Sequence, residues 1–310
     1  MRFVECTVLA EKFGFDTVWF GDHLVPWTHS QNKSAFCWSV MSVALDRTKT
    51  IRVGPVVTTP IGGRYHPIII GQAAATLNNM YPGRFLLGVG SGEAINEAMF
   101  FPQEKWPKWQ ERTERLCEGI TLMKKMWQSP DYFAFEGKYF PLSKFFLYTK
   151  PKTEIPIYFS AVGEKAATYA GIYGDHLVTI NSPSRCRDVI FPIFEAAARK
   201  TGKDPSKMEK MIEMGMSRVR PSQSRSKSVF SDIINETDPR KIEEMRQRVS
   251  DSTHTRLDPS PDDIIEALDS YWKVGATHVE IDTNSFPERI RFLGEKVLPY
   301  FLERREDYSR

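Results

Sequence analysis

The chain has 310 residues, of which 41% are hydrophobic and 26% charged, values that are ordinary for a globular protein in water. This length suits one large α/β barrel or two medium domains. A net charge of +3 without a basic, aromatic-rich stripe argues against nucleic-acid binding, and the lack of a membrane-spanning apolar run or a signal peptide argues for a cytoplasmic protein.

Helical and strand-like segments alternate along almost the whole chain. The first half of the chain predicts helices at 3–13, 38–45, 67–80 and 109–127, with strands between them at 17–20, 51–57 and 85–89. In the second half, strands at 157–161, 176–180, 210–216 and 277–281 are each followed by a helix, at 164–172, 189–200, 262–273 and 289–301. Short strands that are apolar on both faces are typical of a parallel sheet covered by helices. The pattern predicts a closed barrel or an open doubly wound sheet.

Two stretches break this alternation. Residues 128–150 are rich in aromatic side chains and predict a lid or an edge hairpin. Residues 218–261 are polar and predict a mobile insertion or a disordered loop. A basic cluster in the second stretch is better explained as a solvated surface than as an anion site, and it comprises Arg218, Arg220, Arg225 and Lys227.

The most informative segment is TVWFGDHLVPW, residues 17–27. A buried strand ends at Gly21 and is followed at once by Asp22, His23 and Trp27. In barrels of alternating strands and helices, chemistry takes place at this end of the strands. His23 titrates near neutral pH and can move a proton. The alternative, that Asp22 and His23 only cap the following turn, stays equally open on this segment alone.

Two further strand ends carry polar groups. The string GVGSGEAINE at 88–97 combines glycines, which allow close backbone approach to a ligand, with Ser91 and Glu93. It does not match the dinucleotide fingerprint, and a tight turn is the alternative. Glu93 favours a site, because a carboxylate is costly in a core. Thr59, which follows the strand at 51–57, is expected to point toward the same place.

The string SAVGEKA at 160–166 also follows a strand and opens a helix. Lys165 and the free N–H groups of the helix start can hold a phosphate. The alternative is an exposed lysine in the first turn of a helix. His66, which precedes Pro67, is expected to be a structural turn residue.

The chain shows no signature of a metal site, a serine hydrolase or a disulfide framework. The histidines lack metal-ligand spacing, and HxH, HExxH and GxSxG motifs do not occur. The cysteines lie far apart without a CxxC pair, which predicts reduced, buried thiols, and they are Cys6, Cys37, Cys117 and Cys186.

Taken together, these strings resemble the coenzyme F420-dependent members of the bacterial-luciferase-like superfamily, and especially its glucose-6-phosphate dehydrogenases and secondary alcohol dehydrogenases. The shared strings are DHLVPW, TTP, YPGRFLLGVGSGEAINE and IPIYFSAVGEKAATYAGIYGDHLVT. The resemblance implies one TIM-type (β/α)8 barrel domain over 1–310, with insertions at 128–150 and 218–261. It also implies a homodimer acting on a small-molecule substrate.

The resemblance further assigns roles to individual residues. His23 would take the hydroxyl proton of a carbinol as a hydride passes to the deazaflavin, Trp27 would exclude water, and Glu93 would manage the proton or charge at the ring edge. The cofactor would contact Asp22, Thr59, Ser91, Gly92 and Asn96. A non-proline cis peptide between Val56 and Val57 would back its ring. The cofactor's phosphate would lie against Val162, Gly163, Lys165 and Ala166.

Two departures from the family pattern matter. Family members begin with a strand ahead of the first helix, and here Met1 stands at that helix, so the first barrel strand is expected to be missing. A misassigned start, closure by a partner and an open seam remain as explanations. Sugar-phosphate members carry a threonine and a lysine where this chain has Ile180 and Pro183. That difference weakens glucose 6-phosphate as the substrate, although other cations remain as substitutes, namely Arg185, Arg256, Arg289 and Arg291. The string DHLVT at 175–179 is more similar to the alcohol dehydrogenases, and the substrate is expected to be a secondary alcohol or a sugar hydroxyl.

Two other functions remain open from the sequence. One is an FMN-dependent monooxygenase of the same superfamily, against which the GSGEAINE and DHLVPW strings argue. The other is a non-catalytic F420-binding relative that has lost its first strand, against which the presence of His23, Trp27 and Glu93 argues.

Overall fold

The computed structural model describes residues 2–102, 105–215, 233–251, 259–283, 286–304 and 306. Its centre is a curled parallel sheet in the order β3 (Leu87–Val89), β6 (Ile157–Ser160), β7 (His176–Thr179), β8 (Lys210–Gly215) and β9 (His278–Asp282). These five strands form half of a barrel.

Two more parallel strands extend this sheet. β1 (Thr17–Phe20) pairs with β2 (Arg52–Pro55), and isolated bridges from Val53 to Phe85 and from Thr58 to Val89 connect them to the β3 side. Among the described residues, β1 pairs only with β2 and β9 only with β8. The predicted alternation of strands and helices is therefore confirmed, and the strand ends share one edge because all seven strands of this series are parallel.

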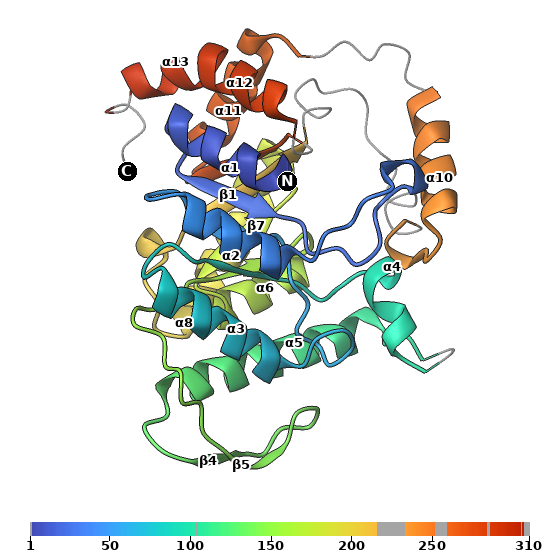
Figure 1. The fold of residues 1–310 in the computed structure, drawn as a ribbon, viewed down its shortest axis with the longest axis vertical. Coiled ribbons are helices and arrows are strands. Elements are labelled where there is room, and N and C mark those ends of the chain that lie inside the picture. Colours follow the sequence, from blue (N-terminus) through green and yellow to red (C-terminus); the bar gives the residue numbers. More distant parts are fainter. Residues whose placement is uncertain are drawn as a thin grey trace.

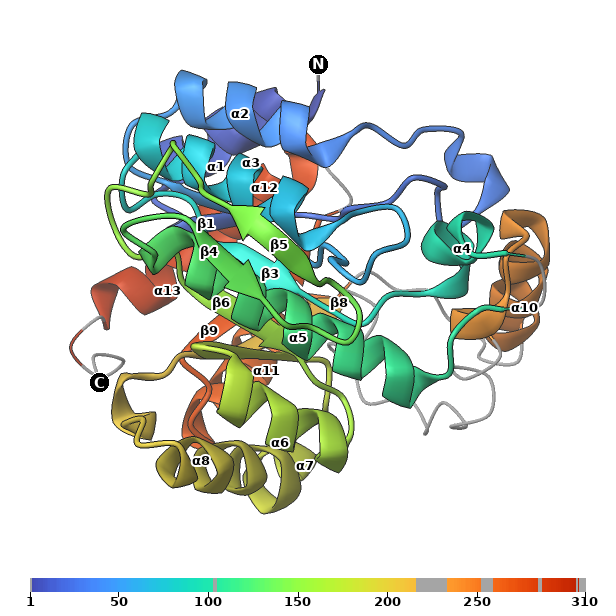
Figure 2. The ribbon, with the colours of Figure 1, turned by 90° about the horizontal axis from the view of Figure 1, so that it is seen from below.

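Helices cover the outer face of the sheet (Figure 1). They are α1 (Arg2–Phe13), α2 (Cys37–Arg47), α3 (Pro67–Met80), α5 (Trp109–Gln128), α6 (Glu164–Tyr173), α8 (Phe191–Lys200), α11 (Pro261–Lys273), α12 (Pro287–Lys296) and α13 (Leu298–Glu303). Figure 2 shows α6 and α8 together on one side of the sheet, away from α4 (Ala94–Glu97) and α10 (Pro239–Asp251). Among the described residues, no helix has the length and apolar character needed to cross a membrane.

Local sequence signals explain where several helices begin. His66 precedes the proline that opens α3, and its Nδ1 accepts a hydrogen bond from the Ile68 backbone N–H at 3.3 Å. This confirms His66 as a structural residue, because it satisfies one of the free donors at a helix start. α11 begins with a capping box in which Ser260 and Asp263 each bind the other's backbone N–H.

The core has two layers. The larger layer lies between the sheet and its helices, and a smaller cluster, with Leu86, Tyr158, Val178 and Met211, lies inside the curl. Val178 and Met211 are register partners in β7 and β8, so their side chains share the inner face.

All four cysteines are free and buried, as predicted, and burial raises the pKa of each thiol. Cys6, Cys37 and Cys117 lie in α1, α2 and α5, and Cys186 opens the π-helical segment Cys186–Ile190 before α8.

One of the two alternatives for residues 128–150 is confirmed, because this stretch contains an antiparallel hairpin of β4 (Phe133–Phe135) and β5 (Leu142–Phe145) beside α5 (Figure 1). A role of this stretch as a lid stays a prediction. Two other expectations are modified by the structure. The closing helix is divided into α12 and α13, because Pro299 in the first turn of α13 has no N–H to continue the α12 ladder.

The expectation of a loop at 218–261 is wrong over Pro239–Asp251, where α10 forms. Most of the described side chains of α10 are exposed or half-buried, which agrees with its polar sequence. Ile242 is the exception and is fully buried. The basic cluster of Arg218, Arg220, Arg225 and Lys227 lies outside the described residues.

Candidate active site

The three residues expected to carry chemistry meet at the carboxyl ends of the strands. His23 and Trp27 follow β1 and have ring centroids 5.0 Å apart, and Glu93 follows β3 with its Oε2 4.0 Å from His23 Nε2. The guanidinium of Arg246, on α10, lies 5.1 Å from the Trp27 ring centroid. Figure 1 shows α10 beside the loop that follows β1. An imidazole, an indole and a carboxyl from separate segments therefore face one another.

Burial acts on the two titrating groups in opposite directions. It lowers the pKa of the His23 imidazole, so this ring is neutral at pH 7. It raises the pKa of the Glu93 carboxyl to about 8, and the negative charge of Glu213 adds to this effect. At pH 7 the site therefore holds a neutral imidazole and a protonated carboxyl, with His23 Nε2 and Glu93 Oε2 4.0 Å apart.

The Asp22 carboxylate is buried and accepts four hydrogen bonds from the chain itself. The donors are Arg64 Nη2 at 2.6 Å, Thr58 Oγ1 at 2.7 Å, the Tyr65 hydroxyl at 3.2 Å and Trp38 Nε1 at 3.3 Å. Arg64 Nη1 also donates to the Asp22 backbone oxygen at 3.0 Å. This network fixes the backbone just before His23. The predicted contact between Asp22 and the cofactor stays a prediction.

The loop after β3 packs closely against the end of β2. Gly92 has a φ of +81°, and a Cβ atom at this position would lie 2.7 Å from Thr59 Cγ2. A Cβ atom at Gly90 would lie 2.5 Å from Val57 Cγ2. Both positions therefore require glycine. The Val56–Val57 peptide bond is cis, as the resemblance implied. Ser91 is held through its backbone oxygen, which accepts from Arg112 Nε at 3.1 Å.

The third strand-end loop leads from β6 directly into the first turn of α6. Gly163 is the N-cap of α6 without a side-chain cap, so the first N–H groups of this ten-residue helix are free of side-chain acceptors. Lys165 is exposed in the same turn, and Ala166 is buried beneath it. Asn181 Nδ2 donates to the Val162 oxygen at 2.8 Å. Because β6 pairs with β3, this loop leaves the sheet beside the Ser91 loop.

Sequence reasoning did not identify the residues that hold Asp22. Thr58, Arg64 and Trp38 lie in three other segments, and no local pattern connects them to β1. The only local signal is the position of Thr58 next to Thr59, at a strand end that was already expected to face the site. Arg246 was also missed, because it lies in a stretch expected to be a loop.

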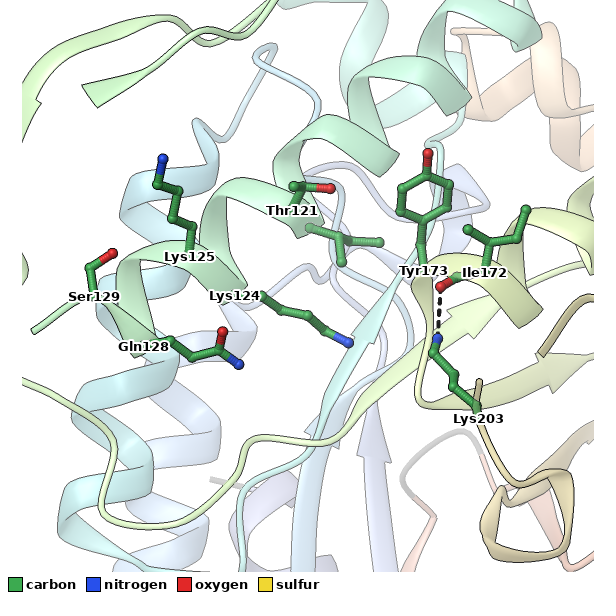
Figure 3. A pocket seen from close by; sticks show the side chains of 9 residues that line it. Thr121, Lys124, Lys125, Gln128, Ser129, Ile172, Tyr173 and Lys203 are labelled. Carbon is green, nitrogen blue, oxygen red and sulfur yellow. Dashed lines mark hydrogen bonds between the residues drawn. The ribbon is translucent and has the colours of Figure 1, made fainter. Parts of the chain in front are cut away.

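A groove of about 530 Å³ lies elsewhere, between α5, α6 and Lys203 (Figure 3). Lys124 Nζ is 2.5 Å from Asp175 Oδ1, and Lys203 Nζ donates to three backbone oxygens, including that of Ile172 at 2.7 Å. The groove shares no residue with the strand-end loops. Among the described residues, no group of three or more His, Cys, Asp or Glu side chains is arranged to hold a metal ion.

Residues 1–278 match the luciferase-like monooxygenase family. A relative, the F420-dependent glucose-6-phosphate dehydrogenase of Rhodococcus erythropolis, is 33% identical in an alignment that covers 94% of this chain and 89% of that protein. The structure of an F420-dependent secondary alcohol dehydrogenase in complex with an F420-acetone adduct is 34% identical, with a TM-score of 0.81 over 95% of this chain and 93% of that one.

A more distant structure, the coenzyme F420-dependent tetrahydromethanopterin reductase from Methanopyrus kandleri, shares the fold with a TM-score of 0.68 at 18% identity, over 97% of this chain and 95% of that one. The family match covers most of the chain, and the first relative is aligned over nearly the full length of both proteins. The chain therefore belongs to the luciferase-like monooxygenase family.

Proposed function

We propose that this protein is a coenzyme F420-dependent oxidoreductase that transfers a hydride between a substrate carbinol carbon and the deazaflavin ring. The observation that carries the proposal is the approach of His23 Nε2 to Glu93 Oε2, 4.0 Å apart beside the Trp27 ring. The F420-dependent dehydrogenases at 33–34% identity over nearly the whole chain support the choice of cofactor.

The strand-end loops fit such a cofactor. Glycines at 90 and 92 leave room at backbone level beside Val57 and Thr59, and the uncapped start of α6 with Lys165 suits an anionic group. We assign the ring end to seven residues, namely Asp22, Val56, Val57, Thr59, Ser91, Gly92 and Asn96. We assign the phosphate end to Val162, Gly163, Lys165 and Ala166. When bound, the deazaflavin supplies the hydride acceptor or donor.

The chain's own residues supply the proton chemistry. An alcohol gives up a hydride readily only when its O–H proton is removed in the same event, so a base must lie within hydrogen-bond reach. His23 is that base, and it returns the proton in the opposite direction. Glu93 holds a proton at pH 7 that it can give to a charge developing nearby. Trp27 covers the reacting carbon and excludes water.

We propose a secondary alcohol and its ketone as the substrate pair, rather than glucose 6-phosphate. Sugar-phosphate members of the family carry a threonine and a lysine where this chain has Ile180 and Pro183, so those groups are not there to bind a phosphate. We also propose that the chain forms a single TIM-type barrel domain and that the enzyme is a homodimer. In this barrel, no strand from the described residues lies between β9 and β1.

The cofactor assignment is tested by titrating the purified protein with coenzyme F420 and, separately, with FMN, following fluorescence quenching. We expect saturable binding of F420 and turnover of secondary alcohols in a substrate panel that includes sugar phosphates. Tight FMN binding without F420 binding would overturn the proposal in favour of a monooxygenase. F420 binding without turnover of any substrate would favour a non-catalytic relative.

A further inference from the structure

The Nδ1 atom of His23 has two polar neighbours that make opposite demands on it. The Val25 backbone oxygen lies 3.2 Å away and can only accept a hydrogen bond. The Asn96 side-chain nitrogen Nδ2 lies 3.0 Å away and can only donate one. A neutral imidazole carries its proton on one nitrogen, so Nδ1 can satisfy one neighbour at a time. The neighbour that wins decides whether Nε2, which faces Glu93, is a donor or an acceptor.

The orientation of the Asn96 amide is fixed by the loop it holds. Its Oδ1 accepts from the backbone N–H groups of Leu24 at 2.9 Å and Val25 at 3.2 Å, so this atom must be the oxygen. Asn96 is 5% exposed and lies in α4, which follows the Glu93 loop. The Nδ2 atom of Asn96 is therefore held toward His23, while its Oδ1 anchors Leu24 and Val25, the two residues that follow His23.

We propose that Asn96 is a positioning residue that keeps neutral His23 in the tautomer with Nδ1 unprotonated and the proton on Nε2. The resting imidazole then presents an N–H to the substrate oxygen, which suits the binding of a carbonyl compound. To act as a base toward an alcohol, His23 must carry its proton on Nδ1, where the Val25 oxygen replaces Asn96 as its partner. Asn96 thus disfavours the base-competent form.

This inference rests on the proposed function for its catalytic meaning, but its test does not need the cofactor. The tautomer of each histidine can be read from the ¹⁵N shifts of the ring nitrogens in long-range ¹H–¹⁵N spectra of the cofactor-free protein, with His23 assigned from a His23→Gln variant. At a pH above the imidazole pKa, we expect Nδ1 of His23 to give the signal of an unprotonated ring nitrogen.

Two other histidines serve as internal references. The Nδ1 atoms of His66 and His176 accept from the backbone N–H groups of Ile68 at 3.3 Å and Glu209 at 2.9 Å. A backbone N–H can only donate, so both rings must carry the neutral proton on Nε2. Their signals calibrate the spectrum and report that a variant has kept its fold.

The variant Asn96→Asp provides a second test, in which the tautomer of His23 is expected to change. An aspartate can accept the same two backbone N–H groups with one oxygen and the Nδ1–H of His23 with the other. We expect it to convert His23 to the Nδ1–H tautomer and to raise the pH at which the ring titrates. It should leave His66 and His176 unchanged. Among the described residues, the other charged or titratable groups around His23 are Glu93, Asp22, Arg64 and Arg246, and they are the same in both proteins.

Two results would overturn the inference. One is a protonated Nδ1 on neutral His23 in the unsubstituted protein, a measurement that does not depend on Asn96→Asp folding. The other is an unchanged His23 tautomer in Asn96→Asp. Failure of F420 to bind would refute the proposed function and leave these spectra interpretable, so the two ideas fail separately.

Discussion

His23 and Glu93 show how one environment can prepare two residues for different tasks. Burial disfavours the charged form of each, so the imidazole loses its proton more easily and the carboxyl holds its proton more tightly. A neutral imidazole and a neutral carboxyl therefore coexist at pH 7 without an ion pair between them. Such a pair is suited to moving one proton to or from a substrate oxygen.

Removal of the imidazole tests the base directly. We expect His23→Ala to lower kcat for alcohol oxidation by about 10²–10⁴-fold, the usual contribution of a positioned base, with little change in F420 affinity. Steady-state kinetics and a fluorescence titration measure the two quantities. His29→Ala is a matched control, because His29 is exposed on the neighbouring 3₁₀ turn. Near-full activity of His23→Ala would show that another group removes the proton.

The pH dependence of kcat/KM should report Glu93. Its acid form is present below a pKa of about 8 and is lost above it, so activity should fall as the pH rises through 8. Activity should also fall at low pH, where His23 becomes protonated. In Glu93→Gln we expect the alkaline limb to disappear and the acidic limb to remain. An alkaline limb that persists in this variant would belong to a different group.

At the scale of elements, the site depends on contacts between loops that follow different strands. Asp22 follows β1 and Arg64 follows the end of β2, and both are buried in one network. A buried carboxylate without its cation is costly, because the charge has lost its water without gaining a partner. The pairing therefore ties the loop that carries His23 to the loop that precedes α3.

Breaking this pair should destabilise the whole fold. We expect Arg64→Met to lower the free energy of unfolding by about 3–5 kcal/mol, as is usual when one member of a buried ion pair is removed. Urea denaturation measures the change. The double variant Arg64→Met with Asp22→Asn should recover part of the loss, because the orphaned charge is gone. Equal stability of the single and double variants would mean that water reaches the Asp22 carboxylate.

The elements also show what the sequence can and cannot predict. The alternation of apolar strands and amphipathic helices placed Asp22, His23 and Glu93 at one edge, because parallel strands bring their carboxyl ends together. The bonds from Arg64, Trp38 and Thr58 to Asp22 were not predictable, since they join segments 16–42 residues apart by side-chain contacts that leave no local pattern. α10 was missed because it is polar along its length, and Ile242 is the one buried side chain among those described in it.

At the scale of the molecule, the sheet has two kinds of strand. β6 and β7 have a hydrogen-bonded neighbour on each side, whereas β1 and β9 each pair on one side only among the described residues. Inner strands open only when much of the protein unfolds, while strands paired on one side can open locally.

Hydrogen exchange should separate these two classes. We expect the amides of β1 and β9 to exchange faster than those of β6 and β7 under native conditions, because fewer bonds must break to expose them. Exchange followed by mass spectrometry resolves the four strands. β8 is the matched control, since it adjoins the outer strand β9 but pairs on both sides. Equal protection of all the strands would indicate that a further segment covers β1 and β9.

The four buried thiols have a use that is independent of catalysis. They are distributed over α1, α2, α5 and the segment that leads into α8, and none is exposed. A thiol-alkylating reagent can therefore label each cysteine only when its own part of the helical shell detaches. The order in which the four peptides acquire label would map how the shell comes apart, without introducing any probe into the protein.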